Sequence, residues 1–452
     1  MSALASNAAP RTRDLSDLIT ALFVKWRAEG VKFLVLRNYE GLPATTGNDV
    51  DILVRPGQLK LAERVLVSVA RDAGYHLHNR AEFSPVSLFF FQPETLRQIH
   101  VDLFHKLEWR GFDFLNADAL LDWRVHLGLF AVPHRVHQAV NDLLMRQLYH
   151  GYVKEDYKPF IHDGLRQFPV EMETVLRRIF GDHVGRRLAR AIHAERWADV
   201  EAQTRNMRRH LVLRRLVYRP FDTLASLLKD AKRLFSRFCR PPGITVVLLG
   251  ADGSGKSSVA ARLIRALEFS FNPGKGLHVH WKPTVFLHHR RARRPATTDP
   301  HAQAPRNPVA SAFALLYHWL EFWLGAMFQF RCAMFRNGMV LVERYHYDFV
   351  VDPRRYRLQG VPWLARRLFR LLPSPDLVFL LDAPPEILHA RKPEVPLEET
   401  RRQREAYRAL VTNLPQGRIV DCTEPIELVV NRIAHQVLDH LEARLARRRG
   451  RE

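Results

Sequence analysis

The residues best suited to chemistry lie in a glycine-rich segment near the middle of the chain. Residues 250–257 read GADGSGKS, which fits the pattern G-x-x-x-x-G-K-[ST]. Backbone N–H groups of such a loop surround phosphate groups, Lys256 would neutralise the β- and γ-phosphates, and the Ser257 hydroxyl would ligate Mg²⁺. The residues expected to contact the nucleotide are Gly250, Asp252, Gly253, Ser254, Gly255, Lys256, Ser257 and Ser258. The sequence therefore predicts a site for ATP with Mg²⁺, and a chance glycine-rich turn is the alternative.

Downstream segments supply further candidates for catalysis. Glu343 ends the apolar run MVLVE, where a carboxylate would hold Mg²⁺ or its water shell. Arginines after the run DLVFLLD would close over the transferring phosphoryl group, because their forked donors match its oxygens. A solvated basic helix face is the alternative for Arg401, Arg402 and Arg404. The candidate catalytic residues are Lys256, Glu343, Arg344, Asp348 and Arg391.

A second set of acidic residues lies near the N-terminus. Asp49 and Asp51 belong to DVDILV, a predicted strand, so both carboxylates project from the same face. Asp102, in the later strand HVDLF, is a third candidate. Three carboxylates on neighbouring strands would share a divalent metal, and surface aspartates without chemistry are the alternative.

The pattern of apolar residues indicates which elements position these groups. Helices at 14–30 and 57–74 alternate with strands to give a small α/β domain, and the stretch from 115 to 240 is predicted to be helical. After Pro241-Pro242-Gly243, apolar runs alternate with helices, which is typical of parallel strands joined by crossover helices. The predicted parts are 1–115 (α/β), 116–204 (helical appendage), 205–242 (basic amphipathic connector) and 243–452 (α/β with a parallel sheet).

Residues 243–440 resemble the thymidylate kinase superfamily of P-loop kinases. Its D-G-x-G-K loop is similar to residues 252–256, its Asp-Arg-Tyr motif to Glu343-Arg344-Tyr345, its LD-x-P-x-E…R stretch to residues 381–391, and its closing helix has a Tyr that matches Tyr407. The resemblance implies that Arg344 contacts an acceptor phosphate. Trp281-Lys282-Pro283 stands where that family has Arg-Glu-Pro.

The chain departs from true thymidylate kinases after this motif. It has residues 346–355, HYDFVVDPRR, in place of the serine and the Ala-Tyr-Gln stretch that reads the base. Asp348, Asp352, Arg354 and Arg355 form a polar cluster there, either as substrate contacts or as a structural ion-pair network. We therefore expect a sugar-like or other small phosphorylatable acceptor in preference to thymidylate.

The three N-terminal aspartates look like the metal site of the nucleotidyltransferase fold. That resemblance implies two Mg²⁺ ions and nucleotidyl transfer to a hydroxyl group. The Gly-Ser of that family is replaced by Arg37-Asn38, which weakens the expected phosphate cradle. Residues 139–160 look like the helical appendage of such domains, with Lys154 and Lys158 expected near a triphosphate.

Three functions follow from these patterns. The leading one is an ATP- and Mg²⁺-dependent phosphotransferase with a small-molecule substrate and a further nucleotidyl-transfer activity in the N-terminal domain. The second is a nucleoside monophosphate (thymidylate) kinase with an inactive N-terminal domain. The third, a nucleic-acid-binding regulatory NTPase, is suggested by the net charge of +22. No helix-turn-helix, zinc-finger or RRM signature supports it, so a nucleic acid is not an expected partner.

Composition limits the class of protein. The chain has 452 residues, 47% of them apolar, which is enough for two or three folded domains. Three distant cysteines exclude a disulfide framework and a four-ligand zinc site, and residues 1–20 hold no apolar signal segment, so a cytoplasmic protein is expected. Residues 309–330 are long and apolar but carry His318 and Glu321, which favours a core or lid helix over a membrane span.

The connector 205–240 combines eleven Lys and Arg residues with many leucines. This composition is typical of a helix that lies on an anionic membrane, which would make the protein peripheral to the membrane. A solvated helix packed on its own domains is the alternative. The sequence leaves a dimer open.

Overall fold

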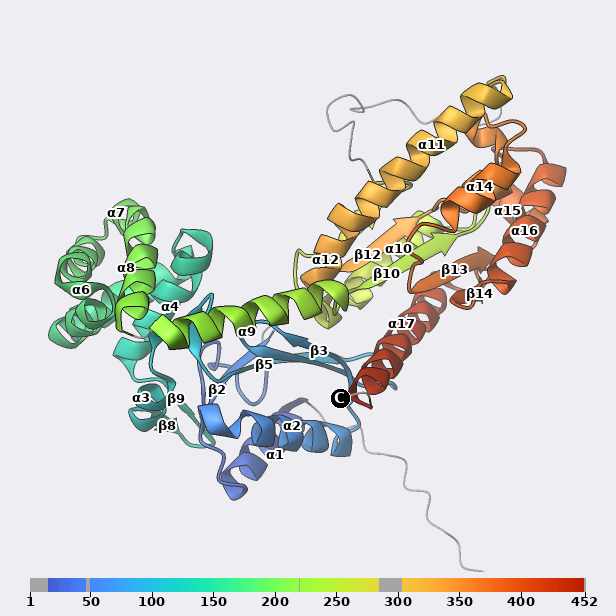
Figure 1. Cartoon of the computed structure of the whole chain (residues 1–452). Helices are drawn as coiled ribbons and strands as arrows, with labels where there is room; N and C mark the ends of the chain where they lie inside the picture. The colour runs from blue at the N-terminus through green and yellow to red at the C-terminus, as the bar shows by residue number, and fades with distance from the viewer. Residues whose placement is uncertain (1–14, 46–48, 219, 284–302, 451–452) are drawn as a thin grey trace, which may run out of the picture. The chain divides into compact units, whose positions relative to one another are not determined.

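The computed structural model describes residues 15–45, 49–218, 220–283 and 303–450 (Figure 1). Arg219 of the predicted connector lies outside them. The chain forms two compact units that divide between Phe235 and Ser236. This division falls inside helix α9 (Pro220–Cys239), and the finer domain limits expected from the sequence stay a prediction.

A five-stranded sheet is the centre of the N-terminal unit. Its strand order is β1-β2-β5-β4-β3, with bounds Phe33–Val35, Val50–Val54, Gln98–Phe104, Val86–Phe91 and His76–Glu82. β2 and β5 run parallel, and the other pairs are antiparallel. Helices α1 (Leu15–Ala28) and α2 (Leu59–Asp72) bury apolar residues in the same core as this sheet. In the β2–β5 register Asp51 lies opposite Asp102, so the sheet itself pairs two predicted metal ligands.

Helices follow this sheet, as the sequence predicts, but they do not begin at once. After the hairpin β6–β7 (Leu107–Trp109, Phe112–Leu115) and α3 (Ala117–Asp122), strands β8 (Val125–Leu127) and β9 (Phe130–Val132) form a second hairpin. The expectation of helix alone was wrong here. Gly128 adopts a φ of +58° in the two-residue turn, a left-handed conformation that glycine takes without strain and that suits a tight hairpin.

The remaining helices of the N-terminal unit pack on one another and on β7. They are α4 (Arg135–His150), α5 (Lys158–Gln167), α6 (Pro169–His193), α7 (Trp197–Ala202) and α8 (Thr204–Tyr218). Their apolar residues share a cluster with the strands β6 and β7 and with α3. The same cluster includes Leu53 of β2 and Phe104 of β5, so α4 shares a core with the two strands that carry Asp51 and Asp102.

The C-terminal unit is built on a parallel sheet. Its order is β11-β12-β10-β13-β14, with bounds Leu277–Val279, Met339–Glu343, Ile244–Leu249, Leu377–Asp382 and Gly417–Asp421. All four strand pairs are parallel. The helices of this unit include α10 (Lys256–Ala266), α11 (Pro308–Leu324), α12 (Arg331–Phe335), α13 (Asp348–Val351), α14 (Pro362–Phe369), α15 (Pro385–Arg391), α16 (Leu397–Thr412) and α17 (Ile426–Arg449). The prediction of an α/β fold with a parallel sheet is confirmed.

Every residue of β10, β12 and β13 is buried. Strands covered on both faces need continuous apolar runs, which explains why ITVVLL, MVLVE and LVFLLD stand out in the sequence. Their carboxyl ends lie at one edge of the sheet, and the glycine-rich loop leaves β10 at that edge.

The apolar stretch 309–330 lies in α11 and a following π-helical turn, Gly325–Phe330. Its Glu321 and Phe322 are buried, whereas Val309 and Phe313 are exposed. Among the helices of the described residues, none combines the length and the apolarity that crossing a bilayer requires. The stretch is thus a half-buried surface helix of the α/β unit.

Candidate functional site

The glycine-rich loop, a predicted phosphate-binding loop, joins β10 to α10, and two of its glycines are required by its shape. Gly253 has a φ of +85°, and a Cβ there would lie 2.2 Å from the carbonyl oxygen of Leu388. At Gly250 a Cβ would lie 2.6 Å from Ser254 Oγ. Larger residues would therefore push the loop away from its neighbours, and the backbone curvature that surrounds a phosphate would be lost.

Lys256 starts α10, and its side chain is buried beneath the loop. Its Nζ donates hydrogen bonds to the carbonyl oxygens of Gly250 and Ala251 at 2.8 and 2.9 Å. Burial, together with the nearby Arg344 guanidinium, lowers the pKa of Lys256 to about 8. The loop therefore orients this cation before any phosphate binds.

Ser257 and Glu343, the two predicted Mg²⁺ ligands of this unit, lie together. The Ser257 hydroxyl donates to a Glu343 carboxylate oxygen at 2.5 Å. Glu343 is the last residue of β12 and pairs in register with Leu248 of β10, so the parallel sheet brings this carboxylate to the loop.

Two histidines that the sequence reasoning missed also contact Glu343. His278 Nε2 and His280 Nδ1 lie 2.8 and 3.4 Å from its carboxylate oxygens. Burial by itself raises the pKa of Glu343, but hydrogen bonds from His280, Ser257 and His278 lower it to about 2. The signal in the sequence was the alternation His278-Val279-His280: His278 lies in the edge strand β11 (Leu277–Val279) next to β12, and His280 follows it directly.

Arg344 follows Glu343 and forms an ion-pair network with the loop. Its guanidinium and that of Arg355 each donate to one carboxylate oxygen of Asp252. Burial raises the pKa of Asp252, but Arg344, Lys256 and Arg355 outweigh it and hold that pKa far below its usual range. Arg344 adopts a φ of +62°, which is strained for a residue with a side chain and is often found at functional sites.

Asp348, a predicted catalytic residue, is buried behind Arg344. It accepts hydrogen bonds from Tyr407 Oη at 2.9 Å and from Tyr356 Oη at 3.4 Å, and Arg344 lies 4.0 Å away. Burial raises its pKa, which Arg344 only partly offsets. With both carboxylate oxygens occupied, Asp348 is arranged to orient Arg344. Asp352 plays the same part for Arg355, whose Nε lies 3.2 Å away.

The predicted arginine lid is paired with carboxylates within its own unit. Arg404 donates to both oxygens of Asp382 at 2.8 and 3.0 Å, and Arg401 and Arg402 form ion pairs with Glu398 and Glu399. Arg391 donates to the carbonyl oxygen of Cys422 at 3.1 Å. Each of these arginines thus has a partner within its own unit, and its contact with a phosphoryl group stays a prediction.

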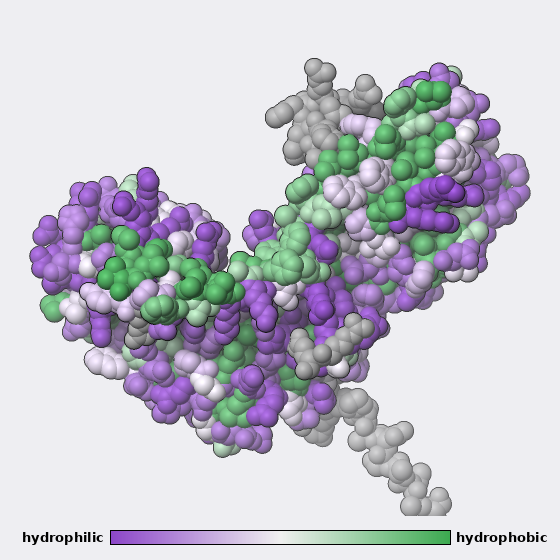
Figure 2. All heavy atoms as spheres, viewed as in Figure 1, coloured by the Kyte–Doolittle hydropathy of each residue, from purple (hydrophilic) through white to green (hydrophobic). Residues whose placement is uncertain are grey.

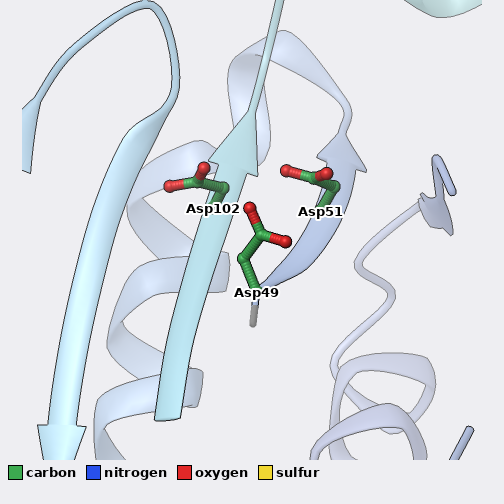
Figure 3. Close-up of side chains that lie close together, drawn as sticks. All are labelled: Asp49, Asp51 and Asp102. Carbon is green, nitrogen blue, oxygen red and sulfur yellow. The ribbon is translucent and has the colours of Figure 1, made fainter. Parts of the chain in front are cut away.

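In the N-terminal unit, Asp49, Asp51 and Asp102 lie close together where β2 and β5 run side by side (Figure 3). One carboxylate oxygen from each lies within 4.8 Å of those of the other two. Asp51 is buried, and its Oδ2 accepts a hydrogen bond from Arg37 while its Oδ1 has no hydrogen-bond partner among the described residues. A buried carboxylate oxygen without a donor fits a cation, because such an atom is costly to leave unsatisfied.

The pKa values of Asp51 and Asp102 are shifted in opposite directions by their surroundings. Burial raises the pKa of Asp51 to about 6, even though Arg37 opposes the shift. Asp102 is also buried, but His100 at 2.9 Å and the Ser87 hydroxyl at 2.5 Å hold its pKa below the usual value. The sequence reasoning found none of these partners, although His100 and Asp102 lie two positions apart in one strand, a spacing that puts both side chains on the same face and signals the imidazole.

The carboxylate of Asp142 also lies near these aspartates and was not identified from the sequence. Asp142 on α4 is buried, and burial raises its pKa to about 7, with Arg37 and Asp51 near enough to affect it. Arg37 thus donates to Asp51 and also affects the pKa of Asp142. Lys154 and Lys158 form ion pairs with Asp156 and Glu155 at 2.9 and 2.5 Å.

Comparison with known proteins adds little to this geometry. No protein-family model matches the sequence, and no curated protein matches it. Among solved structures, the chain is similar to the thymidylate kinase from Ehrlichia chaffeensis, with 15% sequence identity and a TM-score of 0.31. That similarity covers 43% of this chain and all of the other. A score this low carries no argument, so the functional assignment depends on the residues themselves.

Proposed function

We propose that the C-terminal unit is an ATP- and Mg²⁺-dependent phosphotransferase that acts on a small molecule. The observation that carries this proposal is the 2.5 Å hydrogen bond between Ser257 and Glu343 at the base of a glycine-rich loop. It joins the hydroxyl of the loop motif to a carboxylate from the neighbouring parallel strand, and these are the two oxygen donors that phosphoryl transfer uses to hold its metal.

Each residue of the site has a part in this reaction. Lys256 neutralises phosphate charge, and Ser257 and Glu343 hold the Mg²⁺. Bound Mg²⁺ would screen the phosphate charges that otherwise repel an incoming nucleophile. Arg344 and Arg355, both fixed by Asp252, supply positive charge on the acceptor side of the loop.

For the acceptor, we propose a sugar-like metabolite that carries a phosphate group. A phosphate acceptor needs cations and no general base, and Asp348 is buried with both oxygens hydrogen-bonded. Trp281 stacks on Tyr356 with ring centroids 5.1 Å apart, which offers an aromatic surface of the kind that sugar rings pack on. Thymidylate is the alternative acceptor, and the missing serine and Ala-Tyr-Gln elements argue against it.

The test is an assay of the full chain with ATP and Mg²⁺ against thymidylate, free sugars, sugar phosphates and other nucleoside monophosphates. Turnover of a sugar phosphate that exceeds that of thymidylate would support the proposal. Efficient thymidylate phosphorylation would identify the alternative. If only free sugars react, the acceptor is a hydroxyl group, and Asp348→Asn should then lower turnover while ATP binding is retained.

A second activity, metal-dependent nucleotidyl transfer, is proposed for the N-terminal unit. The observation that favours it is the cluster of three carboxylates within 4.8 Å, one of them with a buried oxygen that lacks a partner among the described residues. Asp49, Asp51 and Asp102 would hold the metal, which would activate a hydroxyl toward the α-phosphate of a nucleoside triphosphate.

Its test is the double variant Asp49→Asn with Asp51→Asn. We expect this variant to lose pyrophosphate release from nucleoside triphosphates and to keep the kinase reaction. The matched control is Asp17→Asn with Asp72→Asn, because both residues are exposed aspartates of the same unit. Equal loss of both reactions in the first variant would contradict two separate sites.

A further inference from the structure

Helices α8 and α9 carry an apolar face that no part of their own unit covers. Its residues lie between positions 213 and 235, and all of them are exposed. They are Leu213, Leu216, Val217, Tyr218, Phe221, Leu224, Leu227, Leu228, Leu234 and Phe235, which we call the α8–α9 apolar face. Figure 2 shows apolar side chains gathered where α8 meets α9. An exposed patch of this extent normally marks an interaction site.

Helix α9 turns its apolar side outward and its polar side inward, the reverse of an ordinary surface helix. Phe221, Leu224 and Leu228 recur at three- and four-residue spacing on the outward side. Polar residues occupy the inward side, where Thr223 is buried and Arg233 donates to the backbone carbonyl of Phe83. Arg215 of α8 likewise donates to the carbonyl oxygen of Gly111. These polar contacts hold the apolar side outward, although burial in the unit's own core would favour the opposite rotation.

The adjoining ends of the two helices are the most exposed part of this face. Phe221 is 86% exposed and Tyr218 79%, the two highest values among the large apolar side chains of the described residues, and Val217 is 72% exposed. Aromatic rings at the tip of a helical pair are suited to the boundary between headgroups and acyl chains, because such rings combine a large apolar area with little conformational entropy to lose.

Basic residues outnumber acidic residues on both helices of the face, although the exposed Asp222 lies at the start of α9. α8 contains no acidic residue, and Arg205, Arg209 and Arg214 of this helix are exposed. On α9, Lys229 and Lys232 are exposed, and Lys232 borders the apolar side. Their long aliphatic stems allow the ammonium groups to reach a charged surface while the apolar residues are buried.

We infer that the α8–α9 apolar face binds the surface of an anionic lipid bilayer, with α9 parallel to the bilayer plane. Apolar side chains would enter the boundary region, and the flanking lysines and arginines would pair with acidic headgroups. A second copy of the chain fits this face less well, because a two-fold symmetric contact would bring the same basic residues of both copies together. The proposal does not depend on either activity.

The experiment is flotation of the full chain with lipid vesicles. Vesicles of phosphatidylcholine with phosphatidylglycerol should bind the protein at about 0.1 M salt, and binding should fall at least about ten-fold at about 1 M salt, where the Debye length shrinks from ~10 to ~3 Å. Pure phosphatidylcholine vesicles should bind about ten-fold less.

Two pairs of variants separate the apolar from the electrostatic contribution. Phe221→Glu with Phe235→Glu should weaken binding to the anionic vesicles about ten-fold or more, because it places charge in the part that enters the bilayer. The matched control is Trp123→Glu with Val170→Glu, which adds the same charge at two exposed apolar residues of the same unit outside the face. This control should retain binding within about two-fold, since two added charges alone change a surface potential little. Lys229→Glu with Lys232→Glu should weaken binding and reduce its dependence on salt.

A fluorescence measurement on a conservative variant tests membrane binding even if the charged variants misfold. Phe221→Trp keeps the apolar character, and its added fluorescence, taken as the difference from the wild type, should shift to shorter wavelength when anionic vesicles are added. No flotation of the wild type at low salt would overturn the proposal. So would equal flotation of the Phe221→Glu, Phe235→Glu variant, or a wild-type dimer in light scattering that this variant dissociates without any vesicle binding.

Discussion

Lys256 and its loop show how individual residues prepare the site for phosphate. The lysine is held by two backbone carbonyl oxygens, and Arg344 lies near enough to lower its pKa. A cation that is already desolvated and oriented needs little rearrangement when it meets an anion, and such preorganised charge is the largest contribution to many enzymatic rates.

Replacing this cation should abolish phosphoryl transfer. In Lys256→Ala we expect a loss of turnover of at least about 10³-fold, as for other groups that stabilise developing charge. The measurement is ADP release with the acceptor found in the assay above. Lys275→Ala, an exposed lysine of the same unit, is the control and should keep full activity. Undiminished turnover in Lys256→Ala would rule out the kinase assignment.

Alanine substitutions at two glycines of the loop separate the cost of backbone strain from the cost of steric overlap. Gly253 and Gly255 both have positive φ, +85° and +80°, but a Cβ meets the Leu388 carbonyl oxygen at 2.2 Å only at Gly253, and at Gly255 nothing lies within 4 Å. Gly255→Ala should cost about 1 to 2 kcal/mol from backbone strain alone. Gly253→Ala should lower both the melting temperature and the affinity for ATP more strongly. Equal effects of the two variants would show that the loop can move away from Leu388.

The unusual pKa of Asp51 predicts how metal binding depends on pH. Because burial raises this pKa to about 6, the carboxyl group is mostly protonated at pH 5 and mostly ionised at pH 7. A metal requires the ionised form, so Mn²⁺ should bind about ten-fold more tightly at pH 7 than at pH 5. Calorimetry on Glu343→Gln, which weakens the other metal site, measures this. Equal affinity at both pH values would contradict a role for Asp51 as ligand.

In the absence of metal, the raised pKa of Asp51 makes the folded state less stable as the pH rises, whereas the same pH rise strengthens metal binding. A carboxyl group whose pKa is raised in the folded state stabilises that state below its ordinary pKa, and this contribution is lost as the pH rises through about 6. In the presence of a chelator, the N-terminal unit should therefore melt at a lower temperature at pH 7 than at pH 5. Added Mn²⁺ should restore the melting temperature at pH 7.

At the scale of elements, a buried ion pair ties the end of β11 to α11. Lys282 and Glu321 form this pair, and each side chain is only 1% exposed. His318 lies 3.2 Å from the Lys282 ammonium group. This pair explains how an apolar helix accommodates its charged residue: Glu321 faces inward to a lysine, while Val309 and Phe313 face outward.

Breaking that pair should destabilise the C-terminal unit. Glu321→Leu leaves the Lys282 charge buried, and we expect a loss of about 3 kcal/mol or more in the free energy of unfolding. The double variant Lys282→Met with Glu321→Leu removes both charges and should recover most of the loss. Urea unfolding would measure the stability of both variants. The transition of the C-terminal unit would be recognised as the one that ATP shifts to a higher urea concentration. If the double variant is no more stable than Glu321→Leu, the cost comes from packing and not from the unpaired charge.

At the scale of the whole molecule, the two candidate sites belong to different compact units. Lys256→Ala should therefore leave Mn²⁺ binding at the N-terminal aspartates within about two-fold of the wild type, because measured effects of distant sites are usually additive. Conversely, Asp49→Asn with Asp51→Asn should leave the KM for ATP unchanged. If Lys256→Ala changes the Mn²⁺ affinity and the aspartate variant changes the KM for ATP, the two sites are coupled. That result would contradict the assignment of separate activities.

Much of the fold could be predicted because its signals are local. The strands ITVVLL and MVLVE are continuous apolar runs, and the glycines at 250, 253 and 255 mark a loop whatever surrounds it. The hairpin at 125–132 escaped prediction because its strands have three residues each, too few to show alternation. Some partners of the candidate ligands, such as His280 for Glu343, were missed because they lie far apart in the chain and meet only in the folded structure.

By itself, the sequence determined most of the order of strands and helices, the glycine-rich loop at 250–257 and the basic, apolar character of residues 205–240, but not the hairpin at 125–132. These features follow from periodicity and residue type over short stretches of chain. Only the tertiary structure decided that Asp51 lies opposite Asp102, that Asp252 receives both Arg344 and Arg355, and that the apolar side of α9 faces outward. Register, ion pairing and helix rotation are set by contacts between residues far apart in the chain, and no local pattern encodes them.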